Sequence, residues 1–259
     1  MPLLDDIKPE FVAKIKQLSL KHGLSLIDKV RKEQNPLQLK SLLTEAHFGL
    51  YFDTIAQNLK YNNKITDSKL TPDYIFKMNS QEIIAEVCHI YPAQKDMDLQ
   101  KKEDLVIAEY KKKNPDIPVM PIVHSITWQP DKLYGQNGSI SLKANKYGPL
   151  VEQINKPIIL CIYLEFTSAL DPLDLNHSLY GHPAEYIGEF EFGDYSPFCK
   201  FHNLNTGLFY NNEQMRKNIS GVLLRDNNGT FIYYHNFSST NRLSLQNVTF
   251  FLNFQHPYK

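Results

Sequence analysis

Apolar residues near the beginning of the chain recur every three or four positions, a spacing that predicts helices. Phe11, Ile15 and Leu18 define one apolar face, and Gly23 is a typical residue for ending such a helix. A shorter helix is expected between Leu24 and Val30. We therefore expect residues 1–35 to form a helical extension.

A stronger helix start follows at Asn35. Its side chain can accept hydrogen bonds from the first helical turn, and Pro36 suits the first helical position. The apolar residues that follow predict a helix from Pro36 to near Leu59. Glu45 lies within this helix.

Two extended segments come next. Residues 73–76 and 82–90 are rich in β-branched and aromatic side chains, and a turn is expected at residues 78–80 between them, so they predict a β-hairpin. Residues 95–113 are highly charged with few apolar positions, which predicts a helix with a solvated face. Residues 117–127 read as an apolar strand.

The second half of the chain begins with a further predicted helix at 139–153. Its inward residues are expected to include Leu142 and Tyr147, with Lys143 and Lys146 facing outward. Residues 158–166 form an almost continuous apolar run, typical of a strand buried on both faces.

Two more extended runs, 221–225 and 230–235, are joined by a segment that contains Asn228-Gly229, a strong hairpin signal. Aromatic residues are dense in segments 231–234 and 250–254. Such rings can stack on bases in a single-strand binder, but at this density they favour a place in the core.

The composition narrows the function classes. The 259 residues contain 28 basic and 28 acidic side chains, so a protein that binds nucleic acid through bulk charge alone is not expected. The sequence contains neither the GxSxG pattern of serine hydrolases nor the glycine-rich phosphate-binding motifs.

Three features that the sequence lacks bear on the location of the protein and on its cysteines. No apolar run is long enough to span a membrane, and the N-terminal segment is acidic and unlike a secretory signal. The three cysteines, Cys88, Cys161 and Cys199, are far apart and odd in number, which argues against a disulfide framework. We expect a cytoplasmic protein without a membrane partner.

Glu86 is the residue that most requires an explanation. It lies inside an apolar strand, where a carboxylate is costly unless it is paired, hydrogen-bonded or bound to a metal. Strand alternation puts Cys88 on the same face as Glu86. Asp73, at the start of the preceding strand, can converge on Glu86 at one end of the hairpin. Two close carboxylates favour a hard divalent cation such as Mg²⁺ between them.

Pro72-Asp73, a spacer and then Glu86-Val87-Cys88 resemble the PD-(D/E)XK motif of the restriction-endonuclease-like nuclease superfamily. Glu45 fits the glutamate that this superfamily places on the preceding helix. The resemblance covers about residues 36–166. It implies an α/β fold with a restriction-endonuclease-like mixed sheet flanked by helices, within a single domain of residues 1–259. The parts are the extension 1–35, the core 36–166 and a β-rich addition, 167–259.

The resemblance implies a nuclease that hydrolyses phosphodiester bonds in DNA. Asp73, Glu86 and Glu45 would hold Mg²⁺ or Mn²⁺, the backbone carbonyl of Cys88 would add a ligand, and these four residues would form the catalytic set. Many nucleases of this class are dimers, so a homodimer is expected at the level of the family.

One departure from the motif is serious, because Cys88 occupies the position of the motif lysine. Three explanations are open. The metal alone activates the attacking water, the chain has kept the fold and lost cleavage, or a lysine from elsewhere reaches the site. The lysines considered for this role are Lys95, Lys102, Lys143 and Lys146.

Two alternatives to a nuclease are kept. The first is a catalytically inactive protein of the same fold that binds nucleic acid or serves in an assembly. The second is a zinc-stabilised interaction protein, because some spacings in the second half resemble those of zinc ligands. The residues concerned are His177, His182, Cys199 and His202.

Overall fold

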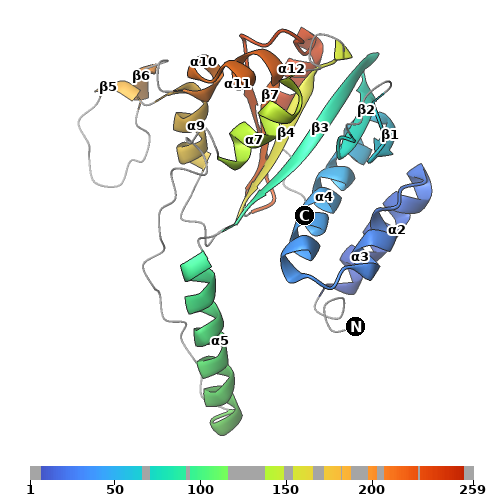
Figure 1. Cartoon of the computed structure of the whole chain (residues 1–259), viewed down its shortest axis with the longest axis vertical. Helices are drawn as coiled ribbons and strands as arrows, with labels where there is room; N and C mark the ends of the chain where they lie inside the picture. Colours follow the sequence, from blue (N-terminus) through green and yellow to red (C-terminus); the bar gives the residue numbers. More distant parts are fainter. Residues whose placement is uncertain are drawn as a thin grey trace.

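A mixed β-sheet forms the centre of the protein. The computed structural model describes residues 7–65, 71–91, 94–115, 138–148, 154–165, 172–181, 183–187, 198–202, 207–226 and 228–253. Within them the central sheet has six strands in the order β1-β2-β3-β4-β7-β8 (Figure 1). These strands are β1 (Gln57–Tyr61), β2 (Tyr74–Met78), β3 (Gln81–Ile90), β4 (Ile158–Leu164), β7 (Gly221–Arg225) and β8 (Phe231–His235). A separate antiparallel pair consists of β5 (Pro183–Ile187) and β6 (Phe198–His202).

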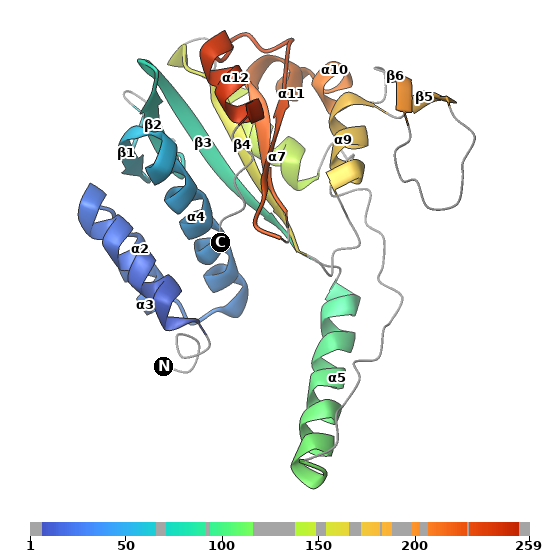
Figure 2. The ribbon, with the colours of Figure 1, turned by 180° about the vertical axis from the view of Figure 1, so that it is seen from behind.

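Helices pack on both faces of the central sheet. On one face lie α2 (Pro9–His22), α3 (Leu26–Lys32), α4 (Pro36–Ile55) and α12 (Leu245–Asn253). On the other face lie α7 (Ser139–Lys146), α9 (Pro172–Tyr180), α10 (Leu208–Asn211) and α11 (Glu213–Asn218). Each face has its own buried hydrophobic cluster. The helix α5 (Gln94–Lys113) projects away from the body of the molecule (Figures 1 and 2). The predicted α/β class is confirmed.

The hairpin of β2 and β3 is present as predicted. Met78 pairs with Gln81, and Asn79 and Ser80 between them have φ angles of 46° and 68°. Two successive residues with positive φ are typical of a type I′ turn, whose twist matches that of the flanking strands. This tight turn fixes the register of the two strands.

The predicted buried strand is also confirmed as β4. It lies parallel to β3 on one side and parallel to β7 on the other. Helices cover both faces of such a strand, which explains its almost continuous apolar sequence.

The helix that begins at Asn35 ends earlier than predicted. Asn35 caps it as expected, because its side-chain oxygen accepts hydrogen bonds from the amides of Leu37 and Gln38. The prediction of a helix to near Leu59 is wrong, since α4 stops at Ile55 and Gln57–Tyr61 is the strand β1. Leu59 and Tyr61 are buried and alternate with exposed residues, which is the two-residue period of a strand.

The C-terminal part, predicted as a β-rich addition, contains both strands and helices. Its hairpin, β7 and β8, extends the central sheet beyond β4, and several helices accompany it. The apolar segment near the end belongs to α12. The aromatic residues Phe231, Tyr233 and Phe251 are buried, as the core interpretation expected. The apolar segment 117–127 lies outside the described residues.

Among the described helices, the apolar length needed to cross a lipid bilayer is not reached.

Candidate acid and lysine site

The register of the hairpin brings Asp73 to the side of Glu86. Tyr74 is opposite Ala85, so Asp73, which precedes Tyr74, lies beside Glu86. At this point β2 begins, whereas β3 extends further. Asp73 Oδ2 accepts a hydrogen bond of 2.7 Å from the backbone amide of Val87. The carboxylate therefore takes the place of a neighbouring strand at this point of β3.

Glu86 is fully buried and bound by three donors. Its side chain is 1% exposed. Lys143 and Lys146 donate to Oε1 at 2.7 and 2.8 Å, and the hydroxyl of Tyr147 donates to Oε2 at 2.6 Å. Burial alone raises the pKa of Glu86, but Lys143 and the hydrogen bonds outweigh burial and hold the pKa below its usual value. Glu86 is therefore a charged carboxylate.

The two lysines come from α7. They are three residues apart, so both side chains lie on one face of the helix. The prediction that this helix buries Leu142 and turns its lysines outward is wrong, because Leu142 is 56% exposed and the lysines face Glu86. The burial of Tyr147 is confirmed. The sequence feature that could have predicted this orientation is Glu86, because a buried carboxylate needs a cation and this helix carries two lysines.

Two of the four lysines considered for the role of the motif lysine thus reach the acids. Lys102 is exposed on α5, and the side chain of Lys95 lies outside the description. Burial alone lowers the pKa of Lys143. The charges of Glu86 and Asp73 have a larger, opposite effect, so the pKa lies above its usual value. Cys88 is buried beside them, 5% exposed, within the hydrophobic cluster under α7.

Glu45 approaches the acids from α4. Its Oε2 accepts a hydrogen bond of 2.5 Å from the hydroxyl of Tyr61. Burial and the charge of Asp73 raise the pKa of Glu45 to about 7. Burial and the charge of Glu86 raise the pKa of Asp73 to about 6. Two carboxyl groups of the site therefore titrate near neutral pH.

The carboxylates of this site repel one another. Lys143 and Lys146 bind Glu86, and Lys29 acts on Glu45. Burial is the largest cause of the raised pKa values of Glu45 and Asp73, and the charge of the neighbouring carboxylate adds to it. A cation beside Asp73 would offset this repulsion, so the charge of the donor set fits a metal.

The geometry sets a condition on such a metal. In the described part of the chain, no three His, Cys, Asp or Glu side chains are grouped so that they could hold an ion. At Glu86, both lysines donate to Oε1 and Tyr147 donates to Oε2. A cation at Glu86 would therefore compete with these donors.

The zinc alternative rests largely on residues that are not described. His177 lies on α9, whereas His182 and the side chains of Cys199 and His202 lie outside the described part of the chain.

We predict that Glu45→Gln makes stability less dependent on pH. Because the pKa of Glu45 is raised in the folded state, its contribution to stability is present below about pH 4.5 and is lost as the pH rises through about 7. The glutamine keeps an acceptor for Tyr61 and removes the charge. At pH 8 the variant should gain roughly 2 kcal/mol in free energy of unfolding relative to the wild type.

Urea unfolding at pH 5 and pH 8 measures this difference. Glu82→Gln is the matched control, because Glu82 is 42% exposed and ion-paired with Lys156. An equal change at both pH values in Glu45→Gln would contradict the prediction.

Comparison of the chain with protein-family models, with curated proteins and with solved structures gives no match. The function therefore has to be inferred from the side chains described above.

Proposed function

We propose that this protein is a metal-dependent nuclease that hydrolyses phosphodiester bonds in DNA. The order of elements supports the proposal. The helix α4, the antiparallel strands β1 to β3, the helices α5 and α7 and the strand β4 parallel to β3 resemble the superfamily order αβββαβ, with two helices described before β4. Glu45, Asp73 and Glu86 lie on the helix, at the start of β2 and on β3, as the resemblance requires.

The observation that carries the proposal is the position of Lys143 and Lys146. They supply, from α7, the positive charge that Cys88 cannot supply from β3. Because Asp73 is the neighbour of Glu86, a phosphate that approaches Asp73 would also meet these ammonium groups. Charges placed in advance stabilise the negative charge that develops on a phosphoryl group in its transition state.

Each side chain has a role in this proposal. Asp73, Glu86 and the backbone carbonyl of Cys88 would hold Mg²⁺, with Glu45 at the helix side. Bound Mg²⁺ supplies Lewis-acid polarisation of the phosphoryl oxygen and a lower pKa for the attacking water. Glu45, on the side of α4, would accept a proton from that water. Lys143 or Lys146 would move from Glu86 toward the phosphate.

Cleavage of supercoiled plasmid DNA in the presence of Mg²⁺ or Mn²⁺ tests the proposal. We expect cleavage by the wild type, none with EDTA, and none by Asp73→Asn. The asparagine keeps an oxygen to accept the amide of Val87, so this variant removes the charge and preserves the strand contact. Glu82→Gln should cleave like the wild type, because Glu82 lies on the same strand outside the site. An RNA substrate in parallel distinguishes the two nucleic acids.

A second candidate function has support from one observation. Glu86 is already satisfied by two lysines and Tyr147, as a structural ion pair would be. This state suits a protein of the same fold that binds nucleic acid without cleaving it. DNA binding in a fluorescence anisotropy titration, with no cleavage under any divalent ion, would favour this candidate over the nuclease.

A further inference from the structure

A second polar cluster lies on the opposite face of the sheet from Glu86. His89, Tyr163 and Arg225 form a row across β3, β4 and β7, because His89 is opposite Tyr163 and Tyr163 is opposite Arg225. All three are near the carboxyl ends of parallel strands. In open α/β sheets this edge is where crevices for ligands form.

A cavity of about 180 Å³ opens between this row and α4. A water molecule in the liquid occupies about 30 Å³, so the cavity has room for a phosphate group and a few waters. Its walls carry polar side chains on both sides. These include Lys40, Thr44, His89, Tyr163, Glu165 and Arg225.

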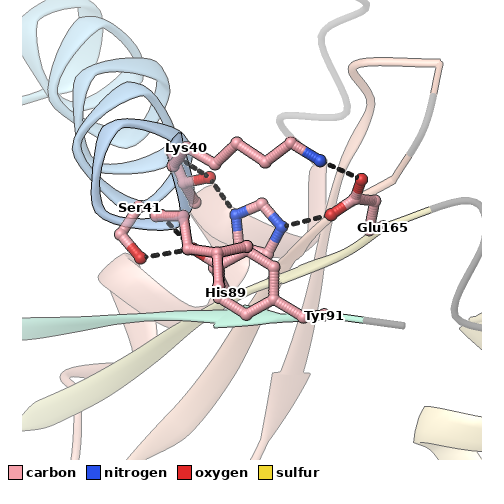
Figure 3. A network of polar contacts seen from close by, with 7 residues as sticks. Lys40, Ser41, His89, Tyr91 and Glu165 are labelled. Atoms are coloured by element: carbon pink, nitrogen blue, oxygen red, sulfur yellow. Dashed lines mark hydrogen bonds and ion pairs between the residues drawn. The ribbon is translucent and has the colours of Figure 1, made fainter. Parts of the chain in front are cut away.

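His89 and Glu165 form a rigid brace at one wall (Figure 3). His89 Nδ1 is 2.8 Å from Thr44 Oγ1, and Nε2 is 3.1 Å from Glu165 Oε2. The ring of Tyr91 stacks on His89 with the centroids 4.0 Å apart. The other oxygen of Glu165 accepts a hydrogen bond of 2.6 Å from Lys40. The brace therefore holds the ammonium of Lys40 at the cavity.

Arg225 adds a second positive charge to the lining of the cavity. Among the described residues no carboxylate forms an ion pair with it, and its guanidinium lies 5.3 Å from the centroid of the Tyr163 ring. Burial lowers the pKa of Arg225, and the attraction of Tyr163 and Asp226 only partly offsets this effect. Among the lining residues, Lys40 and Arg225 against Glu165 leave one net positive charge.

From this cavity we infer a binding site for a phosphate monoester, held by Arg225 and Lys40. The planar fork of a guanidinium matches two phosphate oxygens, and the partly exposed Lys40 adds a point charge. His89 and Glu165 are positioning residues that keep Lys40 in place. The inference does not depend on the proposed nuclease activity, since the acids of that site lie elsewhere.

Calorimetric titration of the full chain in EDTA tests the inference, because EDTA excludes metal at the acid cluster. The probes are inorganic phosphate, adenosine 5′-monophosphate, adenosine, and a short oligonucleotide with or without a 5′-phosphate. We expect a Kd of about 1 mM or tighter for adenosine 5′-monophosphate and much weaker binding of adenosine. A tighter Kd for the 5′-phosphorylated oligonucleotide than for adenosine 5′-monophosphate would identify a strand end as the source of the phosphate. A weaker Kd than for adenosine 5′-monophosphate would identify a free nucleotide.

The variant Arg225→Met should weaken binding at least about tenfold, and Arg225→Lys should weaken it less, because lysine keeps the charge and loses the fork. Arg216→Met, at an exposed arginine on α11, is the matched control and should bind normally. Equal binding of adenosine and its monophosphate would overturn the inference without any variant. An unchanged Kd in folded Arg225→Met or Arg225→Lys would overturn it as well.

Discussion

Glu86→Ala is expected to lower the free energy of unfolding by about 3 kcal/mol, because it leaves two ammonium groups and a buried hydroxyl without their acceptor. Lys143 and Lys146 are 34% and 31% exposed on their side chains, so they can partly turn to water. The hydroxyl of Tyr147 has less freedom, since Tyr147 is fully buried. The loss should therefore lie below that of a completely enclosed ion pair.

Urea unfolding at neutral pH measures this loss. Glu86→Gln is the informative comparison, because the amide oxygen still accepts one hydrogen bond while the charge is absent. We expect a smaller loss for glutamine than for alanine. A Glu86→Ala variant as stable as the wild type would contradict the three contacts of Glu86 with Lys143, Lys146 and Tyr147.

The double variant Lys143→Met/Lys146→Met should lose DNA cleavage by at least about 100-fold, because it removes the positive charge that would meet the phosphoryl group. Methionine preserves much of the aliphatic length of lysine and can pack on α7. The variant also frees Oε1 of Glu86 from both donors. Binding of Mn²⁺, measured by calorimetry, should therefore be retained or become tighter while cleavage is lost.

Lys156→Met is the matched control for this experiment. Lys156 is 34% exposed, like Lys143, and pairs with Glu82 on the same strand as Glu86. It should cleave normally. Full activity in the double variant would show that neither lysine replaces the motif lysine, and would favour activation of water by the metal alone.

Local signals made part of this fold predictable. The cap at Asn35 depends on neighbouring residues, the turn at Asn79-Ser80 needs side chains that tolerate positive φ, and both were found in the expected places. The apolar run of β4 reports burial on both faces directly. Such features are encoded within a few residues, so a single sequence reveals them.

Other features depend on contacts between distant segments. The strand β1 has polar residues at most positions, and it becomes a strand by pairing with β2. Lys143 and Lys146 read as solvated residues until α7 is placed on β3, 57 and 60 residues away from Glu86 in the sequence. The charge of Glu86 predicted that some partner existed, but the identity of the partner is a property of the tertiary arrangement.

The way α7 is attached has a consequence for how the protein opens. A helix of eight residues has little stability in isolation. Packing on the sheet and the ion pairs of its two lysines with Glu86 on β3 therefore stabilise α7. Amide protons of this helix should then exchange with solvent through a local opening that leaves the central strands protected. The segment that brings the cations to the acids is thus expected to exchange before the central strands do.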